Sequence, residues 1–191
     1  MNTPIPYPHA TAVQGQRLIA SGPLDTVALL AKVVVDRPES LPVSVFEDST
    51  GQALEVDFRG TAQDVMERLS ARFTPAPPAP GRPRLGVVPR EVTLLPRHWD
   101  WLASQPGGAS VALRKLVEAA SRTHQQQDRR RAAQEACYRF MSATAGNLPG
   151  FEEAARNLFA GDIAGLETQV QGWPAGLRAH IAKLARQAAE A

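Results

Sequence analysis

The sequence predicts an α+β protein with four consecutive parts. A proline-rich stretch divides the chain, short strand and helix patterns alternate before it, and helical patterns dominate after it. We expect a small antiparallel sheet with two helices at 1–73, a linker at 74–83, a strand-helix-helix segment at 84–122 and a C-terminal helical bundle at 123–191. The 191 residues are enough to bury a core of ordinary size.

Composition excludes several classes of protein. Hydrophobic residues make up 43% and charged residues 21%, as in ordinary globular proteins, which argues against a wholly disordered chain. The longest apolar run, residues 27–35, is interrupted by Lys32 and is far shorter than the ~18 residues of a membrane span. Because Cys137 is the only cysteine, no internal disulfide or thiolate zinc site can form. With no secretory signal in the first seven residues, we expect a cytoplasmic protein without membrane association.

The first 73 residues have the pattern of a sheet covered by helices. A helix from Leu24 to about Asp36 is apolar on most sides, which predicts that it is well buried. Thr61 is expected to cap a second helix, with Asp64 three residues later in a variant of the capping box. Four short strands are predicted around these helices, at residues 9–13, 17–21, 43–46 and 54–58. The first two flank residues 14–16, which we expect to form a hairpin turn.

The last third of the chain is expected to be a helical bundle. Apolar residues recur at spacings of three and four after Ala133, which is one face of a helix. Breaks at 146–150, at Asp162 and at 173–174 separate this helix from three more. Their apolar stripes are most simply core contacts.

Positive charge is concentrated in the middle of the chain. From Gly81 to Arg131 there are ten basic and four acidic residues, a net charge of +6, whereas the remainder carries −4. Such asymmetry is expected of a module that binds a polyanion. A solvated arginine-rich surface is the alternative.

Within this basic region three elements follow one another. A short alternating strand is predicted at Arg90 to Leu95, a helix of about two turns opens at Pro96, and residues 106–108 end it. A second helix follows, in which we expect Arg114 to be exposed. The residues expected to face inward from the two helices are Trp99, Leu102, Val111, Leu113, Leu116 and Val117.

This order of elements resembles the ribbon-helix-helix family of dimeric DNA-binding proteins. In that family, strands from two chains pair into an antiparallel ribbon that enters the major groove. The start of the second helix holds a phosphate. The resemblance therefore implies a homodimer that binds DNA. It implies that Thr93 contacts a base, and that the phosphate neighbours are Arg90, Arg97, Gly108, Ala109, Ser110 and Arg114.

The sequence carries two further resemblances, one in the basic region and one over the whole chain. Residues 80–84 resemble the core of an AT-hook, which implies that Arg82 and Arg84 lie in a minor groove. The whole chain resembles an uncharacterised bacterial family, number twenty-two thirty-nine among the domains of unknown function. The runs that carry this resemblance are 81–88, 91–102, 105–117 and 148–154. It implies a bacterial origin and supplies no activity.

Signals of catalysis are lacking in the sequence. The four histidines lie far apart and without carboxylates at ligand spacing, so we expect no metal site, and no phosphate-binding glycine loop or nucleophile elbow is visible. We expect no cofactor and no enzyme activity. The leading hypothesis is a non-enzymatic, dimeric DNA-binding or transcription-regulatory protein whose N-terminal domain binds a partner protein or ligand. The alternative is a protein-interaction or scaffold protein in which the strand-helix-helix segment serves only dimerisation or packing.

Overall fold

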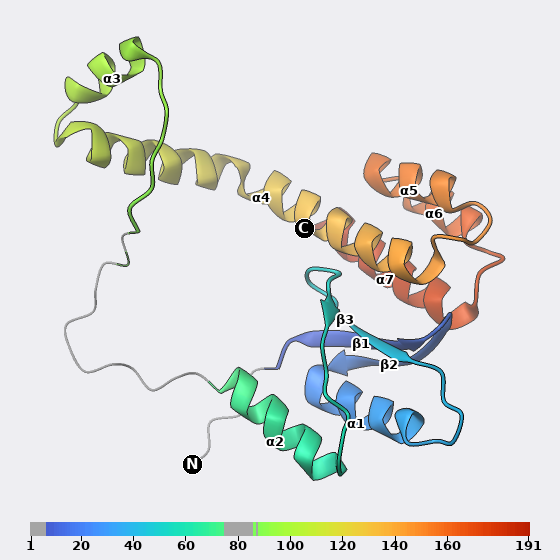
Figure 1. The fold of residues 1–191 in the computed structure, drawn as a ribbon. Coiled ribbons are helices and arrows are strands. Elements are labelled where there is room, and N and C mark those ends of the chain that lie inside the picture. Colours follow the sequence, from blue (N-terminus) through green and yellow to red (C-terminus); the bar gives the residue numbers. More distant parts are fainter. Residues whose placement is uncertain (1–6, 75–85, 87) are drawn as a thin grey trace. The chain divides into compact units, whose positions relative to one another are not determined.

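The chain forms two compact units in the computed structural model, which describes residues 7–74, 86 and 88–191 (Figure 1). The first, here called the sheet unit, comprises Met1–Pro75 and Gln127–Ala191, and the second, the basic unit, comprises Ala76–Gln126. The segments predicted separately as an N-terminal domain and a C-terminal bundle are therefore parts of one compact unit.

An antiparallel four-stranded sheet is the centre of the sheet unit, with strand order β2-β1-β3-β4. The predicted hairpin is confirmed, because Gly15 turns the chain with a φ of 57°. The short β4 pairs with β3 through Val45 opposite Leu54 and Phe46 opposite Ala53. The strand bounds are β1 His9–Gln14, β2 Arg17–Pro23, β3 Val43–Glu47 and β4 Ala53–Leu54.

Helices cover both faces of this sheet (Figure 1). The helix α1 (Leu24–Val35) and the helix α2 (Ala62–Phe73) pack on one face, where the core includes Ala12 and Val45. The C-terminal helices cover the other face, whose core includes Val13 and Phe46. Because successive side chains of a strand point to opposite faces, β1, β2 and β3 supply both cores.

The helix termini follow the predicted signals. Thr61 Oγ1 accepts a hydrogen bond from the Asp64 backbone N–H at 3.2 Å, and Asp64 Oδ2 accepts from the Thr61 N–H at 2.7 Å, so the capping box is confirmed. Asp162 caps the third helix of the C-terminal segment by accepting from the Gly165 N–H at 2.9 Å. The C-terminal helices are α4 Gly108–Ala145, α5 Phe151–Ala160, α6 Ile163–Gln169 and α7 Ala175–Glu190.

Two expectations for the sheet unit are wrong. The apolar helix α1 is not buried all round, because Leu29, Leu30 and Val33 are exposed on its outer face. The strand predicted at 54–58 ends at Leu54, since Arg72 and Arg68 of α2 bind the carbonyl oxygens of the residues that follow. Side-chain hydrogen bonds thus replace the sheet ladder there.

The basic unit also departs from expectation. It contains the helix α3 (Pro96–Ala103) and the first turns of α4, but residues 90–95 form no strand within the chain. The second predicted helix does not end near Arg122, because α4 runs unbroken for 38 residues. Trp99 is 40% exposed, and Leu116 and Val117 are exposed as well, contrary to the inward positions predicted for them.

Gly51 of the sheet unit provides a test of the close contact between the loop after β3 and the helix α4. Gly51 has a φ of 66°, and a Cβ there would collide with the carbonyl oxygen of Ala136 in α4, whereas Gly15 has a φ of 57° and open space around it. Gly15→Ala should cost about 1 kcal/mol of unfolding free energy from the left-handed backbone alone. Gly51→Ala should cost at least about 2 kcal/mol more, because rigid backbone must move. Urea unfolding of both variants compares them, and equal losses would contradict the close contact.

Candidate nucleic-acid interface

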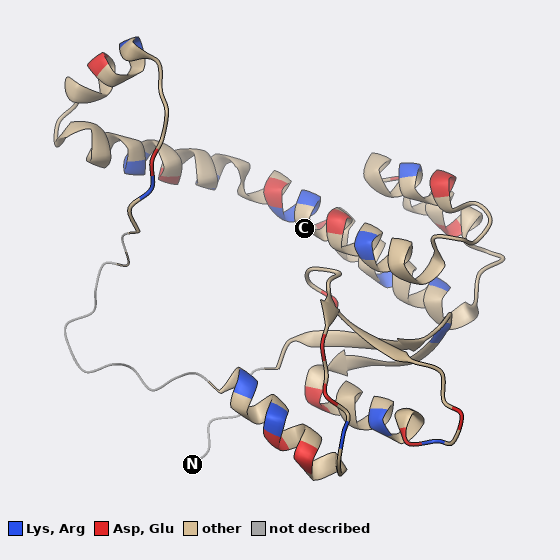
Figure 2. Cartoon of the chain, viewed as in Figure 1, with Lys and Arg blue, Asp and Glu red and all other residues tan. Residues whose placement is uncertain are grey.

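The described residues predicted to meet DNA all lie in the basic unit (Figure 2). Arg90 and Thr93 are exposed on the extended stretch before α3, and Arg97 is exposed on the first turn of α3. The three residues predicted to hold a phosphate, Gly108, Ala109 and Ser110, form the first turn of α4. Arg82 and Arg84 lie outside the described residues.

Two glycines make the turn from α3 into α4. Gly107 and Gly108 have φ values of 86° and 75°, a conformation that other residues adopt at a cost. The Gly108 N–H donates to the carbonyl oxygen of Gln105 at 3.0 Å. The next N–H groups, from Ala109 onward, have no intrahelical acceptor by the geometry of an α-helix, and they carry the positive end of its dipole. The turn therefore presents backbone donors suited to an anion.

Three exposed arginines of the basic unit are available for a polyanion. Arg114 donates from Nε to the carbonyl oxygen of Ser110 at 3.2 Å, which keeps its guanidinium beside the first turn of α4. Within the described residues, no carboxylate forms an ion pair with Arg90, Arg97 or Arg114. Arg122 pairs with Glu118 at 3.9 Å, but both side chains are well exposed, so that pair is weak.

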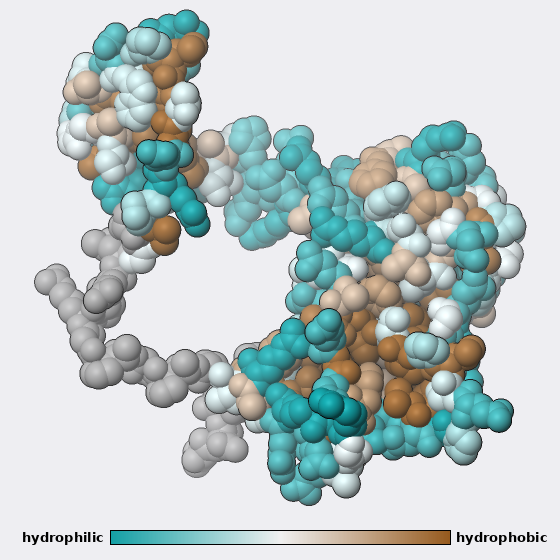
Figure 3. Space-filling view, viewed as in Figure 1, coloured by the Kyte–Doolittle hydropathy of each residue, from teal (hydrophilic) through white to brown (hydrophobic). Residues whose placement is uncertain are grey.

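Exposed apolar side chains surround the same elements. Figure 3 shows brown patches among paler surface on this unit. Among the described residues of the basic unit, the buried hydrophobic side chains are Leu102 and Ala112. The large exposed ones are Val88, Val92, Leu95, Trp99, Trp101, Leu116 and Val117, from 40% to 66% exposed. Exposed apolar surface of this kind is a feature of sites of association.

A buried polar cluster in the sheet unit was missed by the sequence reasoning. Thr11 of β1, Asp48 after β3 and His180 of α7 meet where the sheet packs on the C-terminal helix. Thr11 Oγ1 donates to Asp48 Oδ1 at 2.7 Å, His180 Nε2 lies 3.1 Å from Thr11 Oγ1, and it lies 3.5 Å from Asp48 Oδ1. No local pattern could have revealed a cluster whose members are up to 169 residues apart.

The cluster is structural rather than catalytic. In a hydroxyl-imidazole-carboxylate triad, the hydroxyl and the carboxylate meet opposite ring nitrogens of the histidine. Here both approach Nε2 of His180, and the Thr11 and His180 side chains are almost fully buried. Burial alone would raise the pKa of Asp48, but hydrogen bonds from His180 and Thr11, with the charges of His180 and Lys183, lower its pKa below 3.8.

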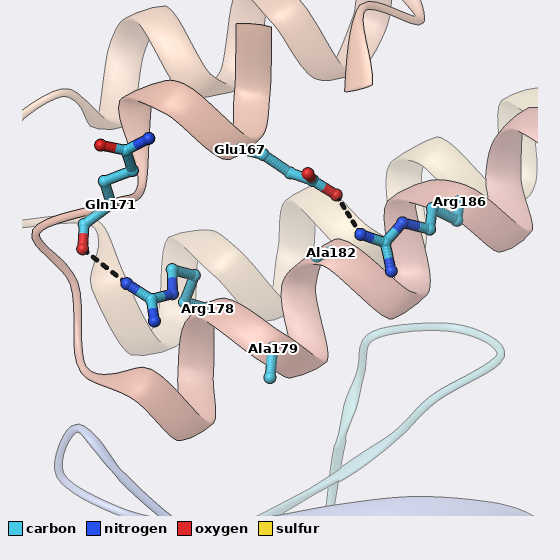
Figure 4. Close-up of a pocket in the computed structure, with 6 residues that line it drawn as sticks. All are labelled: Glu167, Gln171, Arg178, Ala179, Ala182 and Arg186. Atoms are coloured by element: carbon cyan, nitrogen blue, oxygen red, sulfur yellow. Dashed lines mark hydrogen bonds and ion pairs between the residues drawn. The ribbon is translucent and has the colours of Figure 1, made fainter. Parts of the chain in front are cut away.

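Three further features of the described residues bear on chemistry. The groove between α6 and α7 has a volume of about 640 Å³, but Arg186 pairs there with Glu167 and Arg178 donates to the carbonyl oxygen of Gln171 at 2.8 Å (Figure 4). Burial raises the pKa of the Cys137 thiol to about 12, so it is no nucleophile at neutral pH. In the part of the chain that the structure describes, no cluster of three or more potential metal ligands occurs.

Comparison with known proteins places the chain in a family. Residues 9–185 match a family described as an uncharacterized protein conserved in bacteria, DUF2239. The chain belongs to this family. The match spans both the sheet unit and the basic unit, so the two occur together in the family. No curated protein and no solved structure gives a match.

Across residues 7–74 and 88–191, none of the helices combines the length and apolar character that crossing a bilayer requires.

The polar cluster leads to a prediction about pH. Because the folded-state pKa of Asp48 is lowered, its stabilising contribution is present above the unfolded pKa of about 3.9 and is lost as pH falls through the folded value. Asp48→Asn should reduce the free energy of unfolding by about 1–3 kcal/mol at pH 7, because it leaves buried partners poorly satisfied. Thermal unfolding between pH 2 and 7 should show this difference shrinking at the acid end.

The matched control is Glu190→Gln, since Glu190 is exposed near the end of α7. That variant should unfold like the parent at every pH. A loss for Asp48→Asn that stays constant down to pH 2 would contradict the assignment.

Proposed function

We propose that the protein is a non-enzymatic, dimeric DNA-binding protein of the ribbon-helix-helix type, acting in transcription regulation. The basic unit is the DNA-binding module, and a second copy of the chain supplies its missing partner surface. Residues 90–95 of two chains then form the ribbon, with Thr93 toward the bases. Arg90, Arg97 and the first turn of α4 contact phosphates.

The observation that supports this proposal most is the apolar surface of the basic unit. A unit that buries Leu102 and Ala112 yet exposes large side chains on all its elements has too small a core to fold alone. In a ribbon-helix-helix dimer the two chains share one core, so a single chain would present such unpaired residues. The absence of a strand at 90–95 in one chain agrees with this, because a ribbon strand needs a partner in the other.

Dimerisation through the basic unit is testable by charge insertion. The double variant Leu116→Glu/Val117→Glu should be monomeric at micromolar concentration, because it places four carboxylates in the shared core of a dimer. The control Leu30→Glu/Val33→Glu alters a similarly exposed apolar pair on α1 and should remain dimeric. Sedimentation equilibrium measures both, and a monomeric parent chain would contradict the proposal.

DNA binding is testable through its salt dependence. The logarithm of the duplex affinity should fall with the logarithm of salt concentration, with a slope of about −0.9 per phosphate contact. The triple variant Arg90→Gln/Arg97→Gln/Arg114→Gln should flatten this slope by about 2.7 if all three contact phosphates. Replacing Arg17, Arg37 and Arg156, which are exposed in the sheet unit, should leave the slope unchanged.

The exposed apolar surface of the basic unit also supports a second function. The apolar surface fits equally a protein-interaction or scaffold protein in which the module serves only dimerisation. That function predicts a dimer with no measurable affinity for any duplex at 20 mM salt, and the proposed function predicts binding there. The titration above separates them.

A further inference from the structure

The sheet unit has a cleft at one edge of its sheet. The ladder between β3 and β4 ends where Val45 pairs with Leu54, and beyond this point the two chain segments diverge. The resulting cleft has a volume of about 500 Å³ and is lined by residues 43–45 on one side and 53–59 on the other. Both walls are extended backbone.

On the β3 wall, a main-chain edge faces the cleft. The Glu47 N–H donates across to the Gln52 carbonyl oxygen at 2.9 Å, so the main-chain groups of Glu47 point toward β4. Because these directions alternate along an antiparallel strand, those of Val45 and Val43 point the same way. Val45 is paired with Leu54, whereas Val43 lies beyond the end of the ladder.

On the opposite wall, arginines of α2 fix the backbone. Arg72 donates to the carbonyl oxygen of Glu55 at 2.9 Å, and Arg68 donates to those of Asp57 and Arg59 at 2.8 and 2.5 Å. These three carbonyls therefore point toward α2. Leu54 pairs with Val45 of β3, so its main-chain groups point to β3. The same alternation directs the main-chain groups of the two residues between them, Val56 and Phe58, into the cleft. Within the described residues, neither has a backbone hydrogen-bond partner there.

We propose that this cleft binds an extended peptide segment of a partner polypeptide, which adds a strand between β3 and residues 55–59. Unpaired main-chain donors and acceptors on both walls select an extended backbone, the recognition mode of strand addition. Val43, Val56 and Phe58 pack on the core of the α1 face, so apolar side chains on alternate peptide residues would cover them.

Charge at the rim specifies the peptide further. Asp57 is held by Arg59 at 2.7 Å and by Arg68 at 3.6 Å, which lowers its pKa and leaves it compensated. Glu55 is exposed and has no ion pair among the described residues. A lysine or arginine in the peptide opposite Glu55 supplies the complementary charge. The occupant is therefore a short extended segment with alternating apolar residues and one basic residue.

The test uses peptides selected from a random dodecapeptide library on the full chain. Each selected peptide is resynthesised with one backbone N-methyl group at successive positions. Strand addition between two walls predicts that methylation at each peptide residue inside the cleft weakens binding at least about tenfold, because successive N–H groups point alternately to one wall and to the other. Methylation at peptide residues outside the cleft should have little effect. Hydrogen exchange at the amides of Val43, Val56 and Phe58 should slow on binding.

A pair of variants at one position provides the control. Val43→Pro removes a cleft-facing N–H at the first residue of a strand, where proline is tolerated, and should weaken binding about fivefold. Val43→Ala keeps that N–H and should retain most of the affinity. The proposal is overturned if no peptide is selected, if no run of successive N-methyl groups weakens binding, or if the slowed amides lie on another surface. It also fails if the three amides are already protected in the free chain, and none of these outcomes depends on DNA binding.

Discussion

The shortage of apolar burial in the basic unit constrains how this protein can work. In the sheet unit, β1, β2 and β3 send side chains into two helix-covered cores, and both cores are built within one chain. In residues 76–126, by contrast, the described hydrophobic side chains that are buried are Leu102 and Ala112. A small unit cannot offset the conformational entropy of ordering with so little burial. The basic unit therefore needs a second molecule to complete its core; without one, it would not stay folded.

The sheet unit is held together by a different kind of contact. The sheet and α7 meet through apolar packing, and also through the buried cluster of Thr11, Asp48 and His180. Buried polar groups are costly unless they are fully hydrogen-bonded, and in the described residues no buried side-chain nitrogen or oxygen lacks a partner. The cluster therefore fixes one arrangement of the α7 helix on the sheet, while the close approach of Gly51 to Ala136 fixes α4.

Local signals in the sequence predicted most of the elements and little of their association. The hairpin at Gly15, the capping box at Thr61 and the cap at Asp162 depend on neighbouring residues, and all are present. The polar cluster depends on residues up to 169 positions apart, and no pattern of spacing encodes it.

The errors have physical causes as well. Residues 54–58 have the alternation of apolar and polar side chains that is typical of a strand. Arginines of α2, however, donate hydrogen bonds to the carbonyl oxygens of Glu55 and Asp57, and the residues after Leu54 do not pair with β3. Trp99 has the spacing of a core residue, yet it is exposed in a single chain. Periodicity identifies a face that needs covering, and it does not say whether the same chain covers it. The candidate interface has the same limit. The sequence identifies its residues, but it does not show what they bind.

The most direct measurement of the central claim is a mixed-label NMR experiment on the full chain. Equal amounts of isotope-labelled and unlabelled protein are combined, and contacts between Hα atoms of different molecules are recorded across residues 90–95. If residues 90–95 of two chains form a ribbon, cross-strand contacts in an antiparallel register should be seen between the two copies. The ribbon is contradicted if the basic unit is folded in the sample and these residues show no intermolecular contacts.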